Sequence, residues 1–267
     1  MNSISFGDNF VHPFFRLLSV EIPAYGVFMA AGLLFASLLA VIRVRRAGGD
    51  SNDAIIIICC AIGGALLGSF LLYLVASYGL DRVLEDIKNG NYSFFTSGGM
   101  VFYGGVIGGV VGAFLGKLIT HETRNSMLVN AFVPCIPFGH AIGRVGCLFG
   151  GCCYGLPYDG IGAVHLDPVG ITYPVFPIQL LEAAINLFLS GCLLLYSRKK
   201  PSGYTLLYLY LVFYGAIRFI LEFFRGDMIR GVYNGLSTSQ WISVLLVILG
   251  IMLLVYTHTH KKVEVSK

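Results

Sequence analysis

AIIIICCAIGGALLGSFLLYLVASYGL, residues 54–80, is an apolar run without a single charged side chain. It is longer than the ~20 residues that an α-helix needs to cross the hydrocarbon core of a bilayer. A helix that is apolar on every side needs either a very large protein core or lipid around it. The run therefore predicts a transmembrane helix.

The rest of the chain has the same character. Hydrophobic residues make up 56% of the 267 residues and charged residues 12%, and the mean hydropathy is +0.78. Soluble domains typically have ~45–50% apolar and ~25% charged residues. Seven candidate spans follow: 22–42, 54–80, 99–119, 126–151, 177–196, 203–224 and 239–257. Glycines and prolines dilute the third and fourth, and we expect the fourth to be broken. The sequence thus predicts an all-α polytopic integral membrane protein of about seven helices, a single transmembrane domain over residues 1–267.

Basic residues alternate between the loops, which gives the orientation by the positive-inside rule. The loops predicted to be cytoplasmic contain Arg43, Arg45, Arg46, Lys117, Arg124, Arg198, Lys199, Lys200, Lys261, Lys262 and Lys267. The opposite side has Arg16, Arg82, Lys88, Arg225 and Arg230, and the 154–176 loop has none. We therefore expect the N-terminus outside and the C-terminus in the cytoplasm. The net charge of +4 is explained by the basic residues at the membrane flanks. Because these residues form no basic stripe, we expect no nucleic-acid partner.

Charged residues flanked on both sides by membrane-like sequence include Arg144, Glu182 and Arg218. A charge at bilayer depth costs at least ~2.5–3.5 kcal/mol, so each must face the helix bundle and find a partner. Two guanidinium groups in the outer half of the membrane suit the phosphate of a lipid headgroup, because they match phosphate oxygens and stay charged when desolvated. The structural alternatives are a staple between Arg144 and Glu182, and an i,i+4 pair between Arg218 and Glu222.

Helical spacing places further polar residues beside the two arginines. A helix over 203–224 carries Tyr214, Arg218, Glu222 and Arg225 on one stripe. In the fourth run His140 precedes Arg144 by one turn, so both project to the same side. Histidine titrates near neutrality, which makes His140 a candidate general base; the alternative is a hydrogen-bonded interior histidine.

Three of the seven cysteines lie together in CLFGGCC, as Cys147, Cys152 and Cys153. Three thiolates are suitable ligands for zinc or copper, but a fourth ligand is needed and the paired spacing of structural zinc sites is absent. Reactive or redox-active thiols are a second possibility. Small apolar filling of a glycine-rich turn is the third, and the sequence favours it. We assign no metal ligand and expect no cofactor.

Six motifs in order along the chain resemble the prolipoprotein diacylglyceryl transferases of bacterial inner membranes. They are AYGVF around Tyr25, GGMVFYGG from Gly98, GRVGCLFGGCCYG from Gly143, PIQLLEA from Pro177, YGAIRFILEFFRGD from Tyr214 and STSQW from Ser237. The resemblance covers nearly the whole chain.

The resemblance implies a seven-span enzyme of the bacterial inner (plasma) membrane. Its partners would be the lipid bilayer, phosphatidylglycerol and the prolipoprotein signal peptide. The enzyme would move a diacylglyceryl group from the lipid onto the lipobox cysteine as a thioether, with glycerol phosphate leaving. Matching positions imply that Arg144 and Arg218 bind the phosphate. The residues that would shape the site around them are Tyr25, Gly104, Gly155, Tyr214 and Glu222.

Several polar residues of the family pattern are replaced in this chain. Tyr103 stands where the family has the histidine of HGG. In the signature GRxGNFxNxExxG, Cys147 and Gly150 replace the two asparagines and Cys152 replaces the glutamate. Asn130 stands at an expected aspartate.

Two enzymatic hypotheses fit these replacements. In the first, a divergent transferase uses Tyr103 or His140 as the base; His140 is the better candidate because an unperturbed tyrosine has a pKa of ~10. In the second, the chain transfers lipid to another acceptor, or uses Cys147, Cys152 or Cys153 as carrier or nucleophile. A lipid-binding or transport protein is a third hypothesis. Its support is weak, because many transporters contain internal repeats and none is visible in this sequence.

Overall fold

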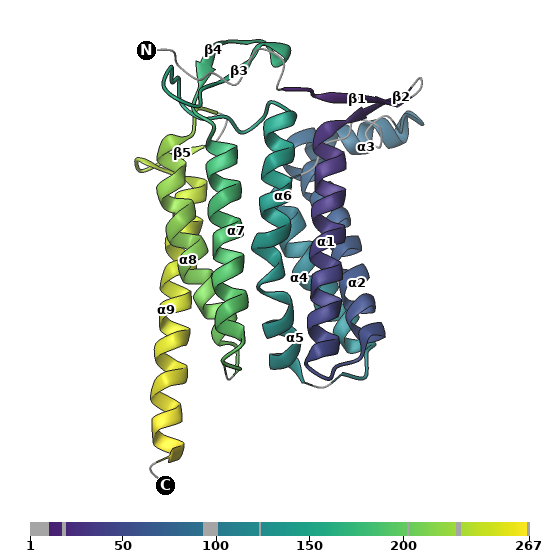
Figure 1. Cartoon of the computed structure of the whole chain (residues 1–267). Coiled ribbons are helices and arrows are strands. Elements are labelled where there is room, and N and C mark those ends of the chain that lie inside the picture. Colours follow the sequence, from purple (N-terminus) through teal and green to yellow (C-terminus); the bar gives the residue numbers. More distant parts are fainter. Residues whose placement is uncertain are drawn as a thin grey trace. The chain divides into compact units, whose positions relative to one another are not determined.

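The computed structural model describes residues 11–17, 20–92, 101–122, 124–201, 203–227 and 231–265. Figure 1 shows that long helices make up most of the structure and that the short β-strands lie outside them. The helices are α1 (Ala24–Arg46), α2 (Ser51–Tyr73), α3 (Leu80–Lys88), α4 (Phe102–Leu118), α5 (Asn125–Phe132), α6 (Cys135–Phe149), α7 (Ile178–Ser197), α8 (Thr205–Leu221) and α9 (Thr238–Val265). The hairpins pair β1 (Phe14–Leu17) with β2 (Val20–Pro23), β3 (Val164–Leu166) with β4 (Ile171–Val175), and β5 (Val232–Tyr233) with β6 (Leu236–Ser237). Gly98, Arg230 and Lys267 lie outside the described residues.

Six helical segments of the described chain are long and apolar enough to cross a membrane. They are Ala24–Arg46, Ser51–Ala76, Asn125–Phe149, Ile178–Ser197, Thr205–Phe224 and Thr238–Thr259. Phe102–Leu118 is apolar but shorter. The predicted all-α polytopic membrane fold is confirmed, whereas the count of seven spans and the orientation of the termini stay predictions.

The fourth apolar run is broken, as the sequence predicts. α5 ends at Phe132 and α6 begins at Cys135, with a turn over Val133 and Pro134. Proline has no backbone N–H to continue the helical hydrogen bonds, which favours a break at this point. The Ser190 hydroxyl on α7 donates to the Pro134 carbonyl at 2.7 Å, so a neighbouring helix satisfies the interrupted backbone.

The chain forms two compact units, one of residues 1–40 and 126–267 and the other of residues 41–125. The second unit is built on close packing of α2 against α4. A Cβ atom added at Gly64 would meet the Gly108 carbonyl, and one added at Gly104 would meet the Gly68 carbonyl. Glycine at these positions lets the two helix backbones approach directly, as in small-residue packing of membrane helices.

The first unit contains the predicted charges of the fourth, fifth and sixth runs. In it α6 packs on α7, α7 on α8 and α8 on α9. The start of α1 also lies against α6, where a Cβ atom on Gly32 would stand 2.8 Å from the Gly139 carbonyl oxygen. The residues that carry candidate chemistry on α6, α7 and α8 are therefore in one unit.

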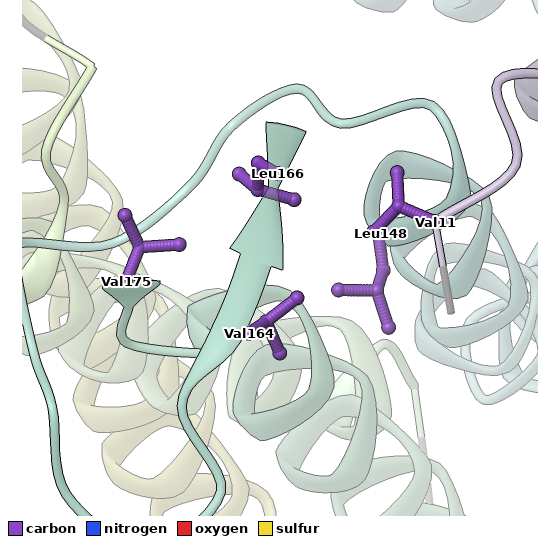
Figure 2. Close-up of a cluster of buried hydrophobic side chains, with 5 residues drawn as sticks. All are labelled: Val11, Leu148, Val164, Leu166 and Val175. Atoms are coloured by element: carbon purple, nitrogen blue, oxygen red, sulfur yellow. The ribbon is translucent and has the colours of Figure 1, made fainter. Parts of the chain in front are cut away.

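The 154–176 loop is a folded cap over one end of α6. It contains the β3–β4 hairpin, and its residues Val164, Leu166 and Val175 are buried together with Leu148 of α6 and Val11 (Figure 2). Leu148 is 1% exposed. This apolar cluster fixes the end of α6 and, with it, the cysteine-bearing turn that follows.

Candidate functional site

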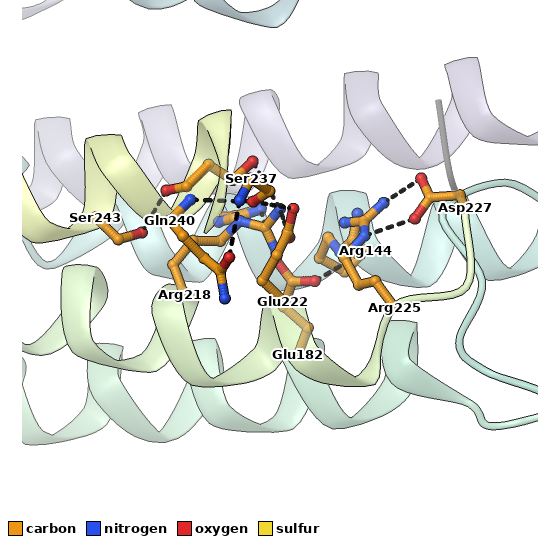
Figure 3. Close-up of polar contacts among 11 residues, drawn as sticks. Arg144, Glu182, Arg218, Glu222, Arg225, Asp227, Ser237, Gln240 and Ser243 are labelled. Atoms are coloured by element: carbon orange, nitrogen blue, oxygen red, sulfur yellow. Dashed lines mark hydrogen bonds and ion pairs between the residues drawn. The ribbon is translucent and has the colours of Figure 1, made fainter. Parts of the chain in front are cut away.

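Arg144 lies on α6, buried to 7% exposure, and contacts the neighbouring helix α7 (Figure 3). Its Nη2 is 2.5 Å from Oε2 of Glu182, and its Nη1 donates to Sγ of Cys147 at 3.5 Å. Within the described residues its Nε has no hydrogen-bond partner. The staple to Glu182 that the sequence offered as an alternative is therefore present, and it leaves part of the guanidinium unsatisfied.

His140 faces the same carboxylate from one turn earlier on α6. Its Nε2 is 3.9 Å from Oε1 of Glu182, a contact that is ionic only when the imidazole is protonated. Its ring centroid is 5.8 Å from that of Tyr214 on α8. The prediction that His140 and Arg144 project to one side is confirmed, and these contacts join α6, α7 and α8.

Arg218 forms a second buried ion pair near the end of α8. Its Nη2 is 2.6 Å from Oε2 of Glu222, the i,i+4 pair that the sequence allowed, and donates to Ser239 Oγ at 3.3 Å. Oε1 of Glu222 accepts from the Ser237 hydroxyl at 2.8 Å. In the part of the chain that the structure describes, Nη1 of Arg218 is buried without a hydrogen-bond partner.

The predicted stripe on α8 is wrong at Arg225. α8 ends at Leu221 and a single 3-10 turn follows over Glu222–Phe224, after which Arg225 is extended with φ −87° and ψ 138°. Arg225 instead forms a bidentate pair with Asp227, at 2.8 Å from Nε and 2.6 Å from Nη2. A local turn thus takes its side chain off the helix face.

Gly155 lies where two backbone segments meet. It forms an isolated β-bridge with Arg225. A Cβ atom at this position would stand 2.5 Å from the Phe176 carbonyl and 3.1 Å from the Phe224 carbonyl. Glycine is required here for backbone packing, which brings the loop after α6 against the end of α8.

The three cysteines of CLFGGCC converge at the end of α6. Their Sγ atoms all lie within 4.8 Å of one another. The turn after the helix has positive φ at Gly151 (65°) and at Cys153 (57°), a conformation that side-chain-bearing residues rarely adopt. The Cys152 amide donates to the Cys147 carbonyl at 3.1 Å, and Gln179 Nε2 on α7 donates to the Cys152 carbonyl at 2.9 Å.

Two of these thiols lie beyond the membrane-spanning helix and differ in acidity. Hydrogen bonds from the Cys147 and Cys152 thiols hold the pKa of Cys153 well below its usual range, and the nearby Arg144 and Arg225 lower it further. For Cys152 the bond to Cys153 and burial outweigh the opposite effect of Cys147 and raise the pKa to about 11. Of these two thiols, Cys153 is therefore the more acidic.

Tyr25 begins α1 beside the cysteine turn. A Cβ atom on Gly150 would stand 3.4 Å from Cβ of Tyr25, and one on Gly146 would stand 3.4 Å from its carbonyl oxygen. Its side chain is 40% exposed. Tyr25 is therefore a neighbour of the candidate site, in the same unit as Arg144.

Three further sequence-based candidates are Tyr103, Gly104 and Asn130. Tyr103 and Gly104 are on α4 in the unit of residues 41–125, where Tyr103 contacts Phe102 edge-to-face and Gly104 packs on Gly68. Asn130 on α5 donates to the Gly203 carbonyl at 2.9 Å, just before α8 begins. Since Arg218 lies near the other end of α8, Asn130 is remote from it within this unit.

Several residues that support the arginines were not predicted as site residues. The sequence offered Glu182 as an alternative partner of Arg144, but not its contact with His140. Gln179 and Ser237 were not marked at all. A signal for Ser237 existed in STSQW, because Ser and Gln three residues apart form a capping box: Ser237 N donates to Gln240 Oε1 at 2.9 Å and Gln240 N to Ser237 Oγ at 3.2 Å.

The site combines two buried guanidinium groups, each neutralised on one edge by a carboxylate. Each also has an N–H group without a partner among the described residues. A buried donor left unpaired costs ~1–3 kcal/mol, which an anionic ligand would recover. Guanidinium N–H groups of this kind can donate to the oxygens of a phosphate ester.

Comparison with known proteins agrees with this chemistry. A family model described as prolipoprotein diacylglyceryl transferase matches residues 13–256. A phosphatidylglycerol–prolipoprotein diacylglyceryl transferase of Clostridium tetani is 32% identical over 89% of this chain and 94% of its own length. The enzyme of that name from Pasteurella multocida is 34% identical over 94% of each chain. This chain belongs to the prolipoprotein diacylglyceryl transferase family.

Proposed function

We propose that this chain transfers the diacylglyceryl group of phosphatidylglycerol to a cysteine thiol of a prolipoprotein. The named relatives carry out this reaction according to their names. The observation that supports it most directly is the pair of buried guanidinium groups, Arg144 with Glu182 and Arg218 with Glu222, each with an unpaired N–H. Anion-binding groups at membrane depth suit a lipid phosphate.

The chemistry assigns a role to each of these residues. The acceptor thiolate attacks the glycerol carbon next to the phosphate oxygen, a C–S bond forms, and the C–O bond breaks. Glycerol phosphate leaves with the bonding electrons. Arg144 and Arg218 bind the phosphate oxygens as this charge develops, while Glu182 and Glu222 orient the two arginines.

His140 is our candidate for the general base. It lies 3.9 Å from Glu182 and in ring contact with Tyr214, in the unit that contains both arginines. Tyr103 on α4 stays the other candidate. Tyr25 and Gly155 border the cysteine turn and would shape the edge of the lipid site. We further propose the plasma membrane as location and the lipobox of the signal peptide as acceptor.

Complementation tests the function. We expect expression of this chain in bacteria depleted of their own transferase to restore the diacylglyceryl mass increment on lipoproteins. The Arg144→Ala and Arg218→Ala variants should insert but give no lipidation, and lysine at either position should rescue only in part because the planar fork is lost. Arg45→Ala, which changes an exposed arginine at the end of α1, is the matched control. Growth without the mass increment would reject the function.

One observation favours a second candidate, in which the chain itself accepts the lipid. Arg144 donates to Sγ of Cys147, so a thiol of the chain already lies beside the phosphate-binding group. Mass spectrometry of the peptide over residues 143–155 after turnover separates the two candidates. A diacylglyceryl adduct on Cys147, Cys152 or Cys153 would support the carrier role, and an unmodified peptide beside lipidated substrate would reject it.

A further inference from the structure

The sulfur atoms of Cys147, Cys152 and Cys153 are arranged as ligands of one ion. All three lie within 4.8 Å of one another. Thiolates bound to a common zinc at ~2.3 Å in tetrahedral geometry are about 3.8 Å apart, so small rotations of the side chains complete the arrangement. In sequence the three are separated by a helix end and a turn, which is why the usual paired spacing is absent.

The backbone of the turn is held in the shape that brings these sulfurs together. Cys153 has φ 57°, a conformation that asparagine or glycine adopts at lower cost, so apolar filling gives no reason for a cysteine here. Gln179 fixes the Cys152 carbonyl, and Leu148 is locked in the apolar cluster of the cap. Strained residues maintained by their surroundings are typical of functional sites.

Two arginine side chains lie near the cluster, and each is also paired with a carboxylate. Arg144 Nη1 is 3.5 Å from Sγ of Cys147, and Arg225 is close enough to Cys153 to lower the pKa of its thiol. Three neighbouring thiolates repel one another, and cations relieve that repulsion. Simple packing of neutral thiols needs no such charges, whereas a metal–thiolate centre with net negative charge does.

We infer that Cys147, Cys152 and Cys153 bind a zinc ion whose fourth position takes the cysteine thiol of the acceptor prolipoprotein. Catalytic zinc sites have three protein ligands and one open position, whereas structural sites have four. Cys152 is exposed, so a fourth ligand can reach the cluster from outside. The inference rests on the proposed function for the identity of the acceptor.

Zinc would supply the activation for which this chain has lost the family histidine. A thiol that binds zinc does so as the thiolate, and its proton passes to water or to His140. The bound sulfur attacks the glycerol carbon, the C–S bond forms and the C–O bond to phosphate breaks. Glycerol phosphate departs with the electron pair toward Arg144, which already contacts the zinc ligand Cys147. The thioether product is a weak ligand and dissociates, with no change of oxidation state.

Metal content of the purified full-length protein tests the inference. We expect about one zinc per chain in the unmutated protein and loss of the zinc in Cys147→Ser, Cys152→Ser and Cys153→Ser. Cys59→Ser and Cys192→Ser change exposed cysteines on α2 and α7 and should retain it. Cobalt exchanged into the unmutated protein should give a thiolate-to-cobalt charge-transfer band that grows when a lipobox peptide is added, and not with its serine analogue. Removal of zinc from the unmutated protein with a chelator, followed by addition of zinc, tests the same site without variants that could fail to fold.

The outcomes separate this inference from the proposed function. Absence of zinc, or a disulfide among the three cysteines in active protein, overturns the metal site. If the protein binds zinc but the cobalt band does not change when the peptide is added, the proposed role of the fourth position is overturned. Full lipidation by chelated protein rejects zinc activation and leaves the transferase intact, whereas a zinc-loaded protein that lipidates no peptide rejects the transferase and leaves the metal site.

Discussion

Arg144 has two roles that only a paired experiment can separate. It staples α6 to α7 through Glu182, and its buried Nε has no hydrogen-bond partner in the part of the chain that the structure describes. Both groups of the pair are nearly buried, at 8% and 4% side-chain exposure. Removal of one partner leaves the other charge buried and uncompensated, so loss of activity in a single variant does not by itself identify a catalytic role.

Arg144→Ala should lower the free energy of unfolding by ~3–5 kcal/mol, because Glu182 is then a buried unpaired carboxylate. The double variant Arg144→Met with Glu182→Leu replaces the pair by apolar side chains and should recover most of that stability. Lipidation should stay absent in both. Thermal melting in detergent and a lipidation assay on the same preparations measure the two effects, and recovery of lipidation in the double variant would show that Arg144 is only structural.

The packing of α2 against α4 depends on which glycine of a pair faces the partner helix. A Cβ atom on Gly64 would meet the Gly108 carbonyl and the Gly112 Cα, whereas one on Gly63 would meet nothing within 4 Å. Gly64→Ala should therefore destabilise the unit by ~1–3 kcal/mol through overpacking, while Gly63→Ala should not. Melting temperatures of the two variants give the comparison; equal values would contradict direct backbone contact between the helices.

The start of α9 links helix capping to the second arginine. Ser237 closes the capping box with Gln240 and also donates to Glu222, the partner of Arg218. Ser237→Ala should cost ~1 kcal/mol of stability and reduce lipidation, because Glu222 loses the contact that orients it.

Ser197→Ala is the control for that variant, since the Ser197 hydroxyl bonds to the Leu194 carbonyl of its own helix. Its lipidation rate should match that of the unmutated chain. If Ser237→Ala also matched it, orientation of Glu222 would not contribute to the reaction.

The orientation of the whole molecule is a prediction from loop charges alone. Alkaline phosphatase fused after Asp159 should be active, because the 154–176 loop has no basic residue and is expected outside. Green fluorescent protein fused after Lys267 should fluoresce, since the basic C-terminus is expected in the cytoplasm. Exchange of the two reporters should abolish both signals, and the reverse pattern would invert the proposed placement of the site at the outer leaflet.

Features that depend on neighbouring residues were predictable from the sequence. Apolar runs such as 54–80 predict helices because backbone polar groups in a bilayer must form their hydrogen bonds within the segment. The break near Pro134 follows from a missing N–H, and the projection of His140 and Arg144 to one side follows from their spacing of one turn. The prediction failed at Arg225, where the helix ends at Leu221 although the apolar pattern continues.

The all-α membrane fold, the buried charges and the family resemblance are encoded locally, in hydropathy, spacing and motif order. The contact of His140 with Glu182, the pairing of Arg225 with Asp227 and the convergence of three sulfurs at the end of α6 required the folded chain. Each depends on backbone turns and on contacts between helices distant in sequence, and a buried charge can be satisfied by whichever partner the packing brings within reach.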